Sequence, residues 1–508
     1  MNKAKYIILI VSVFVFANIF FASCVNEEDY ATDSSISLKF SADTLSFDTI
    51  FTTVGSVTKQ IKVFNNENSP VLIDRITLGS GRNSYFRLNV DGDTSLIAKN
   101  IEIGANDSIF IFVRVEIESN NQNNPLLIQD SIIFSFNNKE QNVQLMAYGQ
   151  DAYYHKPLHT LGNEENGIPY SLANEGGEQA GIVLNGNNIA WKNDKPHIIL
   201  GTCVVDSAFT LNLQSDTKIY MANGSQFWVY KDGSLQAQGS TTNPVLFTSL
   251  RYQDRYSSIP GQWQGLWFMA GSKDNVMDNV IIKNATIGLL ADSCVTNSPT
   301  VYLSNSFIEN CSSIGLYSRG ADIRGENLVV QNTGSYTVAL SLGGEYSFIG
   351  CTFVNYWYYD NARKTATLIL NDWYESVAGL QIRPIRKAEF INTVIYGSLA
   401  GDEIEFDLVE NSQSVFSFSN CLIKSNAFNN NAPFANNCIF NQDPKFVDAS
   451  NNDLHPQDNS PLINNGDGVW NSILPFDIYG VLRQDPPCIG AIEYVPQTTN
   501  SKRRIALR

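Results

Sequence analysis

A dense run of carboxylates lies at residues 402–407, Asp-Glu-Ile-Glu-Phe-Asp. If this run is a strand, alternate side chains point the same way about 7 Å apart, so the acidic ones share one face. Carboxylates in such a row could hold Ca²⁺, and a basic side chain could then remove the proton beside a sugar carboxylate. The residues that fit these roles are the acids Glu403, Glu405 and Asp407, with Glu405 and Asp407 as the Ca²⁺ ligands, and the bases Arg383, Arg386 and Lys387. The core-facing residues would then be Ile404, Phe406 and Leu408.

Strand alternation alone would also produce this pattern, as a solvated face neutralised by neighbouring bases. We favour this simpler interpretation, and therefore expect no cofactor and no metal. Ca²⁺ would be required only if the chain removes protons from an acidic glycan.

A second group that could do chemistry is aromatic and lies between residues 355 and 391. Exposed aromatic rings suit stacking on sugars, and nearby acidic and amide groups could bind hydroxyls. The candidate glycan-binding residues are Tyr356, Trp357, Tyr358, Trp373 and Tyr374. The same rings could instead pack a loop against the protein wall, and the sequence leaves both interpretations open.

Other chemistry finds little support in the sequence. The four histidines include His155 and His159, placed before the repeats described below, and His197 and His455, placed towards opposite ends of them. A histidine-centred catalyst is therefore not expected. The eight cysteines form no CxxC pair and fit no zinc template, so buried free thiols are expected beyond Cys24. The formal charge of −16 argues against nucleic acid as a partner.

One six-residue pattern returns through the second half of the chain and decides the fold. Copies begin at Asn279, Asn305, Asn327 and Gly350, at steps of 26, 22 and 23 residues, and weaker copies begin at Asn392 and Asn420. About 22 residues suit three short strands and three corners, so each copy would mark one coil of a solenoid.

Within each copy, the fourth residue would stack as an apolar ladder inside the solenoid. The sixth residue would form a column of side-chain amides at a corner, because Asn, Gly and Ser tolerate tight turns. The ladder residues are Ile282, Ile308, Val330, Phe353, Ile395 and Ile423. The step of 42 residues from Gly350 to Asn392 breaks this count. It predicts one additional coil around residues 366–370 and a protruding loop.

Residues 36–150 show short alternating runs separated by Asn-, Gly- and Ser-rich turns, for example Ser108–Val115 and Asp130–Phe136. Regular short strands with such turns predict an immunoglobulin-like β-sandwich. Its order of strands is similar to that of domains in ciliary and bacterial surface proteins, which are usually spacers or binding modules.

The N-terminus carries a basic start, an apolar run from Tyr6 to Phe21 and then Ala-Ser-Cys24. This resembles a lipoprotein signal peptide, in which Cys24 is acylated and becomes the new N-terminus. The run of about 16 residues is short for a spanning helix, so the lipid would be the only membrane anchor. The acidic residues 27–29 resemble the signal that exports lipoproteins of Bacteroidota to the cell surface, although a solvated tether would look similar.

The asparagine-cornered repeat resembles the right-handed parallel β-helices of the pectate-lyase-like superfamily. Trp263-Gln-Gly-Leu-Trp267 is similar to an element near the start of many such helices. The end of the chain resembles the closing segment of secreted β-helix proteins of Bacteroidota, which implies that it caps the open end of the stack. The matching closing residues are His455, Ser460, Pro461, Gly466, Asp477, Gly480, Arg483, Gly490 and Glu493. The Gly-His-Gly and Arg-Ile-Lys motifs of the polygalacturonase-like hydrolases are absent.

The expected fold class is all-β, a right-handed parallel β-helix preceded by an immunoglobulin-like sandwich. The expected parts are a signal peptide (1–23), an acidic tether (24–35), the sandwich (36–150), a connecting segment that leads into the solenoid (151–189), the β-helix with its closing segment (190–495) and a basic tail (496–508). We expect an outer-membrane surface lipoprotein whose β-helix binds polysaccharide without cleaving it, held out by the sandwich as a stalk. The alternatives are a lyase or hydrolase acting on an acidic glycan, and a structural adhesin that contacts protein. The sequence does not determine an oligomeric state.

Overall fold

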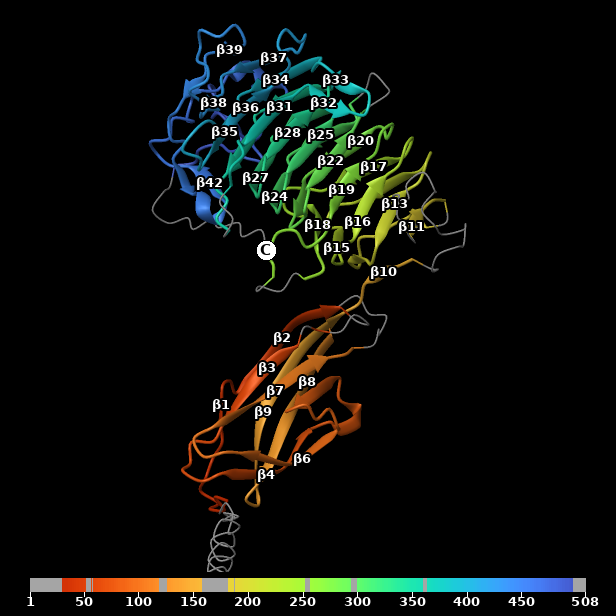
Figure 1. Ribbon diagram of the computed structural model, residues 1–508, viewed down its shortest axis with the longest axis vertical. Helices are drawn as coiled ribbons and strands as arrows, with labels where there is room; N and C mark the ends of the chain where they lie inside the picture. The colour runs from red at the N-terminus through yellow and green to blue at the C-terminus, as the bar shows by residue number, and fades with distance from the viewer. Residues whose placement is uncertain are drawn as a thin grey trace, which may run out of the picture. The chain divides into compact units, whose positions relative to one another are not determined.

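A computed structural model describes residues 30–51, 56, 58–117, 126–157, 181–186, 188–251, 256–293, 299–359 and 363–496. Cys24, His159, Cys294 and the basic tail beyond residue 496 lie outside these ranges. The chain divides into two compact units, residues 1–151 and 152–508 (Figure 1). Among the described residues, no helix is both long and apolar enough to cross a membrane.

The first unit is a β-sandwich of two sheets around one apolar core, as predicted. The side chains of β7 alternate between the core and the solvent, as the sequence pattern predicts for a strand of a sandwich. Ile111 and Val113 are buried, whereas Phe110 and Phe112 on the opposite side are exposed. Its assignment to the immunoglobulin-like domains remains a prediction. One sheet has the order β1 (Lys39–Phe40), β3 (Lys59–Phe64), β7 (Ser108–Val115), β5 (Phe86–Val90), and the other β2 (Thr44–Phe51), β9 (Lys139–Gln150), β8 (Leu126–Phe136), β4 (Val71–Leu78), β6 (Ile97–Ile103).

The second unit is a parallel β-helix with three long sheets. The first solenoid sheet contains β10 (Tyr153–His155), β12 (His197–Ile199), β15 (Lys218–Met221), β18 (Val245–Ser249), β21 (Val280–Lys283), β24 (Phe307–Cys311), β27 (Val329–Thr333), β30 (Thr352–Asn355), β35 (Val394–Gly397), β38 (Leu422–Ile423) and β40 (Ile439–Phe440). The second contains β11 (Gly181–Leu184), β13 (Thr202–Val205), β16 (Gln226–Val229), β19 (Gly265–Phe268), β22 (Leu289–Asp292), β25 (Leu316–Arg319), β28 (Val338–Ser341), β31 (Leu368–Asn371) and β36 (Ile404–Asp407). The third contains β14 (Thr210–Leu213), β17 (Ser234–Gln238), β20 (Asn275–Asp278), β23 (Val301–Ser304), β26 (Asp322–Glu326), β29 (Glu345–Ile349), β34 (Lys387–Ile391), β37 (Phe416–Ser419) and β39 (Ala435–Asn436).

The predicted apolar ladder is confirmed by the register of the first solenoid sheet. Ile282 pairs with Ile308, Ile308 with Val330 and Val330 with Phe353. Phe353 then pairs with Ile395 and Ile395 with Ile423. All six side chains belong to one buried core, which also contains five of the six buried free cysteines among the described residues, Cys203, Cys311, Cys351, Cys421 and Cys438.

Asparagines shape two of the corners. The predicted amide column is present, because the Asn310 amide donates to Asn284 Oδ1 at 2.6 Å and the Asn332 amide donates to Asn310 Oδ1 at 3.2 Å. The first residue of the pattern forms a second corner that the repeat alone did not identify. There Asn305 and Asn327 have φ of 47° and 48°, in the left-handed region where Asn is tolerated better than most residues.

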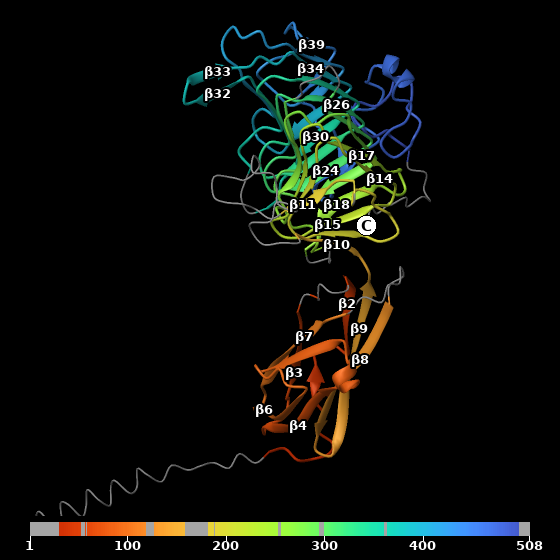
Figure 2. The ribbon, with the colours of Figure 1, turned by 90° about the vertical axis from the view of Figure 1, so that its right-hand side faces the viewer.

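The long coil after Gly350 corrects one prediction. β30 pairs directly with β35 and β31 pairs directly with β36, so there is no additional coil around residues 366–370. Instead, a single coil carries two insertions, residues 356–367 before β31 and a hairpin after it. The hairpin consists of β32 (Trp373–Ser376) and β33 (Gly379–Ile382), and it projects from the solenoid (Figure 2).

The closing segment also differs from the expectation. It does not cap the end of the stack but runs back along the outer side of the first solenoid sheet, where Ile478 and Ile489 pack on Val329, Val354 and Val394. The end of the stack is covered by partly buried phenylalanines, Phe406, Phe416, Phe428, Phe434 and Phe440. The segment includes β41 (Phe446–Asp448), β42 (Asp453–Pro456) and the 3-10 turns at Ala449–Asn451 and Gly468–Ser472; a third 3-10 turn, Gly81–Asn83, lies in the sandwich.

The predicted closing residues anchor this segment to the solenoid. Arg483 donates to Glu493 Oε1 at 2.9 Å and to Asn327 Oδ1 at 2.6 Å, and all three side chains are buried. The carboxylate of Asp477 accepts the backbone N–H groups of Tyr479, Val481 and Glu493.

The placement of His155 before the solenoid is wrong, since β10 is the outermost strand of the first solenoid sheet. His155 Nε2 lies 2.9 Å from His197 Nδ1, and Trp191 stacks on both rings. Burial and then the neighbouring imidazole lower the pKa of His155 to about 3, and burial also lowers the pKa of His197. Both rings are therefore neutral in the folded protein at neutral pH.

Replacing one amide of the column should destabilise the solenoid. Asn310→Gly keeps the left-handed backbone but leaves buried partners unpaired, so we expect a loss of roughly 1–3 kcal/mol in the free energy of unfolding. Asn411 has a φ of 60° in an exposed turn, and Asn411→Gly should change that free energy by less than about 0.5 kcal/mol. Denaturant unfolding measures both; equal effects would contradict the role of the column.

The histidine pair predicts acid sensitivity. Because the folded pKa values lie below the unfolded value of about 6.5, the imidazoles take up protons on unfolding. The contribution of His155 is complete above about pH 6.5 and is lost as the pH falls towards 3, by roughly 2 kcal/mol at pH 5, and that of His197 is lost in the same direction. We expect the Tm to fall between pH 7 and pH 5, and to fall less in His155→Phe. The control is His455→Gln, at an exposed histidine, and its Tm should fall between pH 7 and pH 5 as much as that of the wild type.

Candidate functional site

A second repeat, on the second solenoid sheet, positions the outward side chains of the candidate site. Gly265-Leu-Trp, Gly288-Leu-Leu and Gly315-Leu-Tyr open successive strands, and Thr337-Val-Ala, Thr367-Leu-Ile and Glu403-Ile-Glu continue the series. The middle residue points inward, and the third points outward. The glycine corners are tight, because a Cβ at Gly288 would collide with Ile308.

We name the outward surface of β25, β28, β31 and β36 the acidic–aromatic face; its residues are Tyr317, Tyr336, Asn371, Trp373, Glu405 and Asp407. Tyr336 lies at the corner before β28, and its hydroxyl donates to Glu405 Oε2 at 2.9 Å, two strands further along. Burial, the bond to Glu405 and the charges of Glu405 and Asp407 raise the pKa of Tyr336 to about 12. The phenol therefore stays a hydrogen-bond donor at neutral pH.

Asp407 is held by two neutral donors. The Asn371 amide donates to Asp407 Oδ2 at 2.8 Å, and the Trp373 indole N–H donates to Asp407 Oδ1 at 2.9 Å. Neither partner carries a charge. The Asp407 carboxylate is partly exposed, and each of its oxygens keeps a lone pair that can accept a further hydrogen bond.

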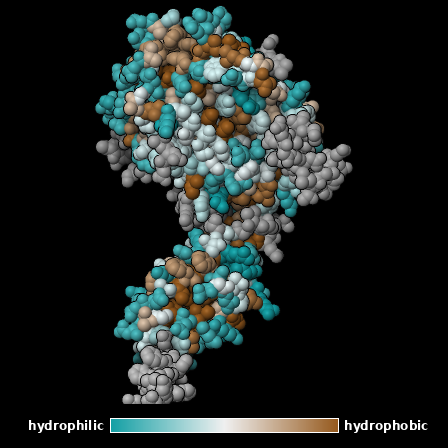
Figure 3. Space-filling model, in the orientation of Figure 1, coloured by the Kyte–Doolittle hydropathy of each residue, from teal (hydrophilic) through white to brown (hydrophobic). Residues whose placement is uncertain are grey.

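The hairpin β32–β33 borders this face with apolar side chains. Trp373 pairs with Ile382 and Glu375 with Leu380, so these four side chains share one side of the hairpin. Leu380, Ile382 and the hairpin-tip residue Val377 are exposed. Figure 3 shows apolar side chains gathered on the surface in this part of the solenoid. An apolar arm beside fixed acceptors suits a ligand with both apolar and hydroxyl surfaces.

Further along the same sheet, aromatic and charged groups are already paired with one another. Arg319 donates to both oxygens of Asp292 at 2.6 and 2.8 Å, and the Trp267 indole N–H donates to Asp292 Oδ2 at 2.8 Å. Arg319 also lies over the Trp267 ring, 5.6 Å from its centroid.

Glu403 does not share the outward face, which corrects the prediction. It occupies the corner position of the second repeat and is fully buried. Arg363 donates to its two oxygens at 2.7 and 2.8 Å, and the Thr367 hydroxyl donates at 2.8 Å. Glu403 therefore closes the 356–367 insertion and is not available to a ligand. Glu405 and Asp407 do point outward, and Ile404, Phe406 and Leu408 pack on the core, as expected.

The predicted bases are not brought to these carboxylates. Lys387 pairs with Glu389 at 2.8 Å on β34, and Arg386 pairs with Asp322, both on the third solenoid sheet. Arg383 lies over the Tyr374 ring, 5.3 Å from its centroid. The described residues contain no group of three or more His, Cys, Asp or Glu arranged to hold a metal ion.

The predicted aromatic residues separate into three places. Tyr356 packs beneath the closing segment against Phe446. Tyr358 stacks on Tyr359, and Trp357 packs against Tyr359 at a tilt. The Tyr359 hydroxyl donates to Asn310 Oδ1 at the amide column. Only Trp373 and Tyr374 lie on the hairpin. The sequence carried a signal for Tyr317 and Asp292 in the second repeat, but the prediction did not use it. Tyr336 lies in a corner outside that repeat, so the repeat would not have located it.

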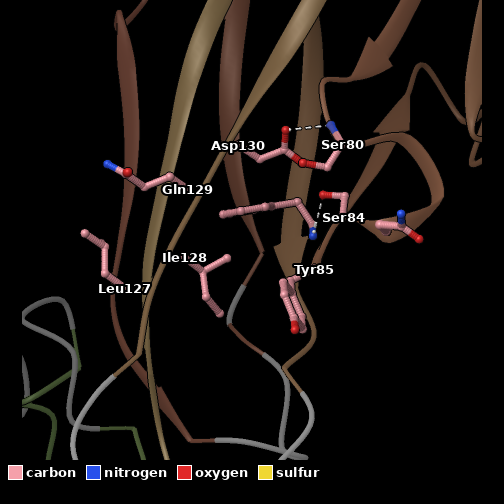
Figure 4. A pocket seen from close by; sticks show the side chains of 9 residues that line it. Ser80, Ser84, Tyr85, Leu127, Ile128, Gln129 and Asp130 are labelled. Carbon is pink, nitrogen blue, oxygen red and sulfur yellow. Dashed lines mark hydrogen bonds between the residues drawn. The ribbon is translucent and has the colours of Figure 1, made fainter. Parts of the chain in front are cut away.

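The sandwich has a small pocket of about 230 Å³ beside Tyr85, Leu127 and Ile128 (Figure 4). Asp130 Oδ1 there accepts the Ser80 N–H at 3.0 Å, and Ser84 Oγ accepts the Phe86 N–H at 3.0 Å. These bonds fix the loop after β4, and we assign the pocket no chemistry.

No protein-family model matches this chain, and no curated protein matches it. Among solved structures, the catalytic unit of the thermostable GH87 alpha-1,3-glucanase from Streptomyces thermodiastaticus strain HF3-3 has 9% identity and a TM-score of 0.26, over 75% of each chain. A family 123 glycoside hydrolase from Clostridium perfringens has 10% identity and a TM-score of 0.18, over 24% of this chain and 31% of that chain. The VesB protease from Vibrio cholerae has 11% identity and a TM-score of 0.17, over 22% and 31%. The chain thus spans about a third of the length of the latter two, and similarity this low supports no argument about function.

The buried ion pair of Arg363 and Glu403 predicts that substitutions of Glu403 and Glu405 differ strongly in their effect on the free energy of unfolding. Glu403→Gln should lower the free energy of unfolding by about 3–5 kcal/mol, because it leaves the Arg363 charge buried without its partner. The exposed Glu405→Gln should cost less than about 0.5 kcal/mol. Denaturant unfolding of the solenoid compares them, and similar losses would show that Glu403 is not a structural anchor.

Proposed function

We propose that this protein binds polysaccharide on the acidic–aromatic face without cleaving it. The observation that carries the proposal is the contact of Tyr336 and Trp373 with the acceptors Glu405 and Asp407, together with Tyr317 three strands away in the same row as Glu405. Aromatic rings offer apolar area to sugar faces, and the fixed carboxylates offer acceptors to hydroxyl groups. Such a mixture of aromatic surface and a few convergent polar groups is typical of ligand sites.

The placement of the carboxylates favours binding over hydrolysis. Glycosidases use two carboxyl groups that flank the scissile bond, one on each side. Glu405 and Asp407 project from one strand towards the same side, so they would meet a bound chain together from below. Lyase chemistry receives less support still, because Lys387 and Arg386 lie on another sheet.

We also propose that the chain is an exported lipoprotein, attached to the outer membrane through Cys24 and displayed at the cell surface. The leader sequence ending in Ala-Ser-Cys supports this proposal, as does the acidic stretch that follows. The lipid would be the only membrane attachment.

The binding proposal is tested by affinity electrophoresis of the chain from Tyr30 onward in gels that contain soluble polysaccharides. Trp373→Ala and Tyr317→Ala should each weaken retention roughly tenfold, because each lost ring contact is worth about 1–3 kcal/mol in comparable stacking. Phe112→Ala, which removes an exposed ring on the sandwich, is the control and should leave retention unchanged.

Release of new reducing ends or of unsaturated products would contradict a non-catalytic role. Retention that is indifferent to both ring substitutions would move the site elsewhere on the molecule. Failure to bind any polysaccharide would overturn the proposal and favour a structural adhesin.

A further inference from the structure

The charges of the acidic–aromatic face limit the kind of polysaccharide that it can accept. Among the described residues of β25, β28, β31, β36 and the hairpin with the residue that follows it, the cations are Arg319 and Arg383. Arg319 is bound at both Nε and Nη2 to Asp292, and Arg383 lies over Tyr374 and donates to its hydroxyl at 3.3 Å. The Arg319 charge is therefore compensated by Asp292, whereas the exposed Arg383 is held by the neutral Tyr374 and keeps its positive charge, one against the two carboxylates of the face.

The carboxylates, in contrast, have no cationic partner. Glu405 accepts from the Tyr336 hydroxyl, and Asp407 accepts from an amide and an indole N–H. Neutral donors hold these groups in place but leave their negative charge uncompensated. A uronate or sulfate group at this face would meet repulsion, which adds to the net charge of −16 of the whole chain.

The arrangement of the outward side chains also indicates the direction in which a bound polysaccharide chain would lie. Tyr317, Ala339, Ile369 and Glu405 occupy one outward row across β25, β28, β31 and β36, and Arg319, Ser341, Asn371 and Asp407 occupy the next. Ala339 and Ile369 of the first row are buried, whereas all four residues of the second row are partly exposed. Neighbouring strands lie about 4.8 Å apart, so the second row offers a new side chain at nearly the length of one hexose unit. The partly exposed Ser341 and Asn371 lie between Tyr317 and Arg319 on β25 and the carboxylates on β36.

We propose that the ligand is an uncharged, hydroxyl-rich polysaccharide whose chain lies along the solenoid axis, from Tyr317 to Asp407. Tyr317 and Trp373 stack on its sugar rings. Glu405 and Asp407 accept its hydroxyl groups and exclude polymers of uronic acids or sulfated sugars. This inference rests on the proposed function and names the ligand class for the same face.

The experiment measures the affinity of the chain from Tyr30 onward by isothermal titration. The neutral probes are a soluble β-glucan, an α-glucan and a mannan; the charged probes are the polyanions polygalacturonate and alginate. We expect at least one neutral probe to bind more tightly than every charged probe. Its Kd should change less than about twofold as the salt concentration rises from roughly 0.05 to 0.5 M, because screening has no charge on the ligand to act on.

Variants then test the residues. Asp407→Asn and Glu405→Gln should each weaken binding of the neutral probe about three- to tenfold, since hydrogen bonds to a charged acceptor are the stronger ones. Glu389→Gln, a partly exposed carboxylate on the third solenoid sheet, should leave the affinity unchanged. Tyr317→Ala should weaken it as well, because the axial path crosses β25. Circular dichroism of each variant checks that the solenoid is intact.

The outcomes separate the two proposals. Tighter, salt-sensitive binding of polygalacturonate or alginate would overturn the uncharged ligand class while leaving polysaccharide binding in place. An unchanged affinity in Tyr317→Ala, with a loss in Asp407→Asn, would overturn the axial path. Binding of no probe of either kind would overturn the proposed function itself.

Discussion

The in-register stacking of coils is the constraint on which the rest of the structure depends. Each strand pairs in parallel with the strand one coil away, so equivalent residues such as Ile282, Ile308 and Val330 repeat at the strand spacing. Asparagines maintain this register in two ways: their backbone adopts the left-handed corners, and their amides bond from coil to coil. Any surface of the solenoid therefore consists of rows of side chains with a fixed period.

A functional surface on such a repeat requires a departure from the period. Here a single coil supplies it, through the 356–367 insertion closed by Arg363 and Glu403 and through the hairpin that carries Trp373. The closing segment covers the outer side of the first solenoid sheet, on Val329, Val354 and Val394. The acidic–aromatic face lies on a different sheet, where the outward row changes from apolar to acidic.

The errors in the sequence-based predictions share a physical cause. Alternation placed Glu403 outward, but strand geometry ends at the corner, and a buried arginine drawn from 40 residues away pairs with it there. The closing segment was predicted to cap the end of the stack, because exposed strand edges generally need to be covered. Its apolar residues instead pack on the outward apolar row of the first solenoid sheet. The second repeat was present in the sequence but weaker, since its corners vary between glycine, threonine and glutamate.

The sequence by itself determined the coil, the inward ladder, the amide column and the outward direction of Glu405 and Asp407. These features follow from local periodicity, in which each residue's direction depends on its near neighbours. Only the tertiary structure decided which of the predicted aromatic and charged residues meet. The partners of Asp407, Glu405 and Glu403 come from other coils or from insertions, and their approach depends on the packing of loops whose lengths follow no repeat.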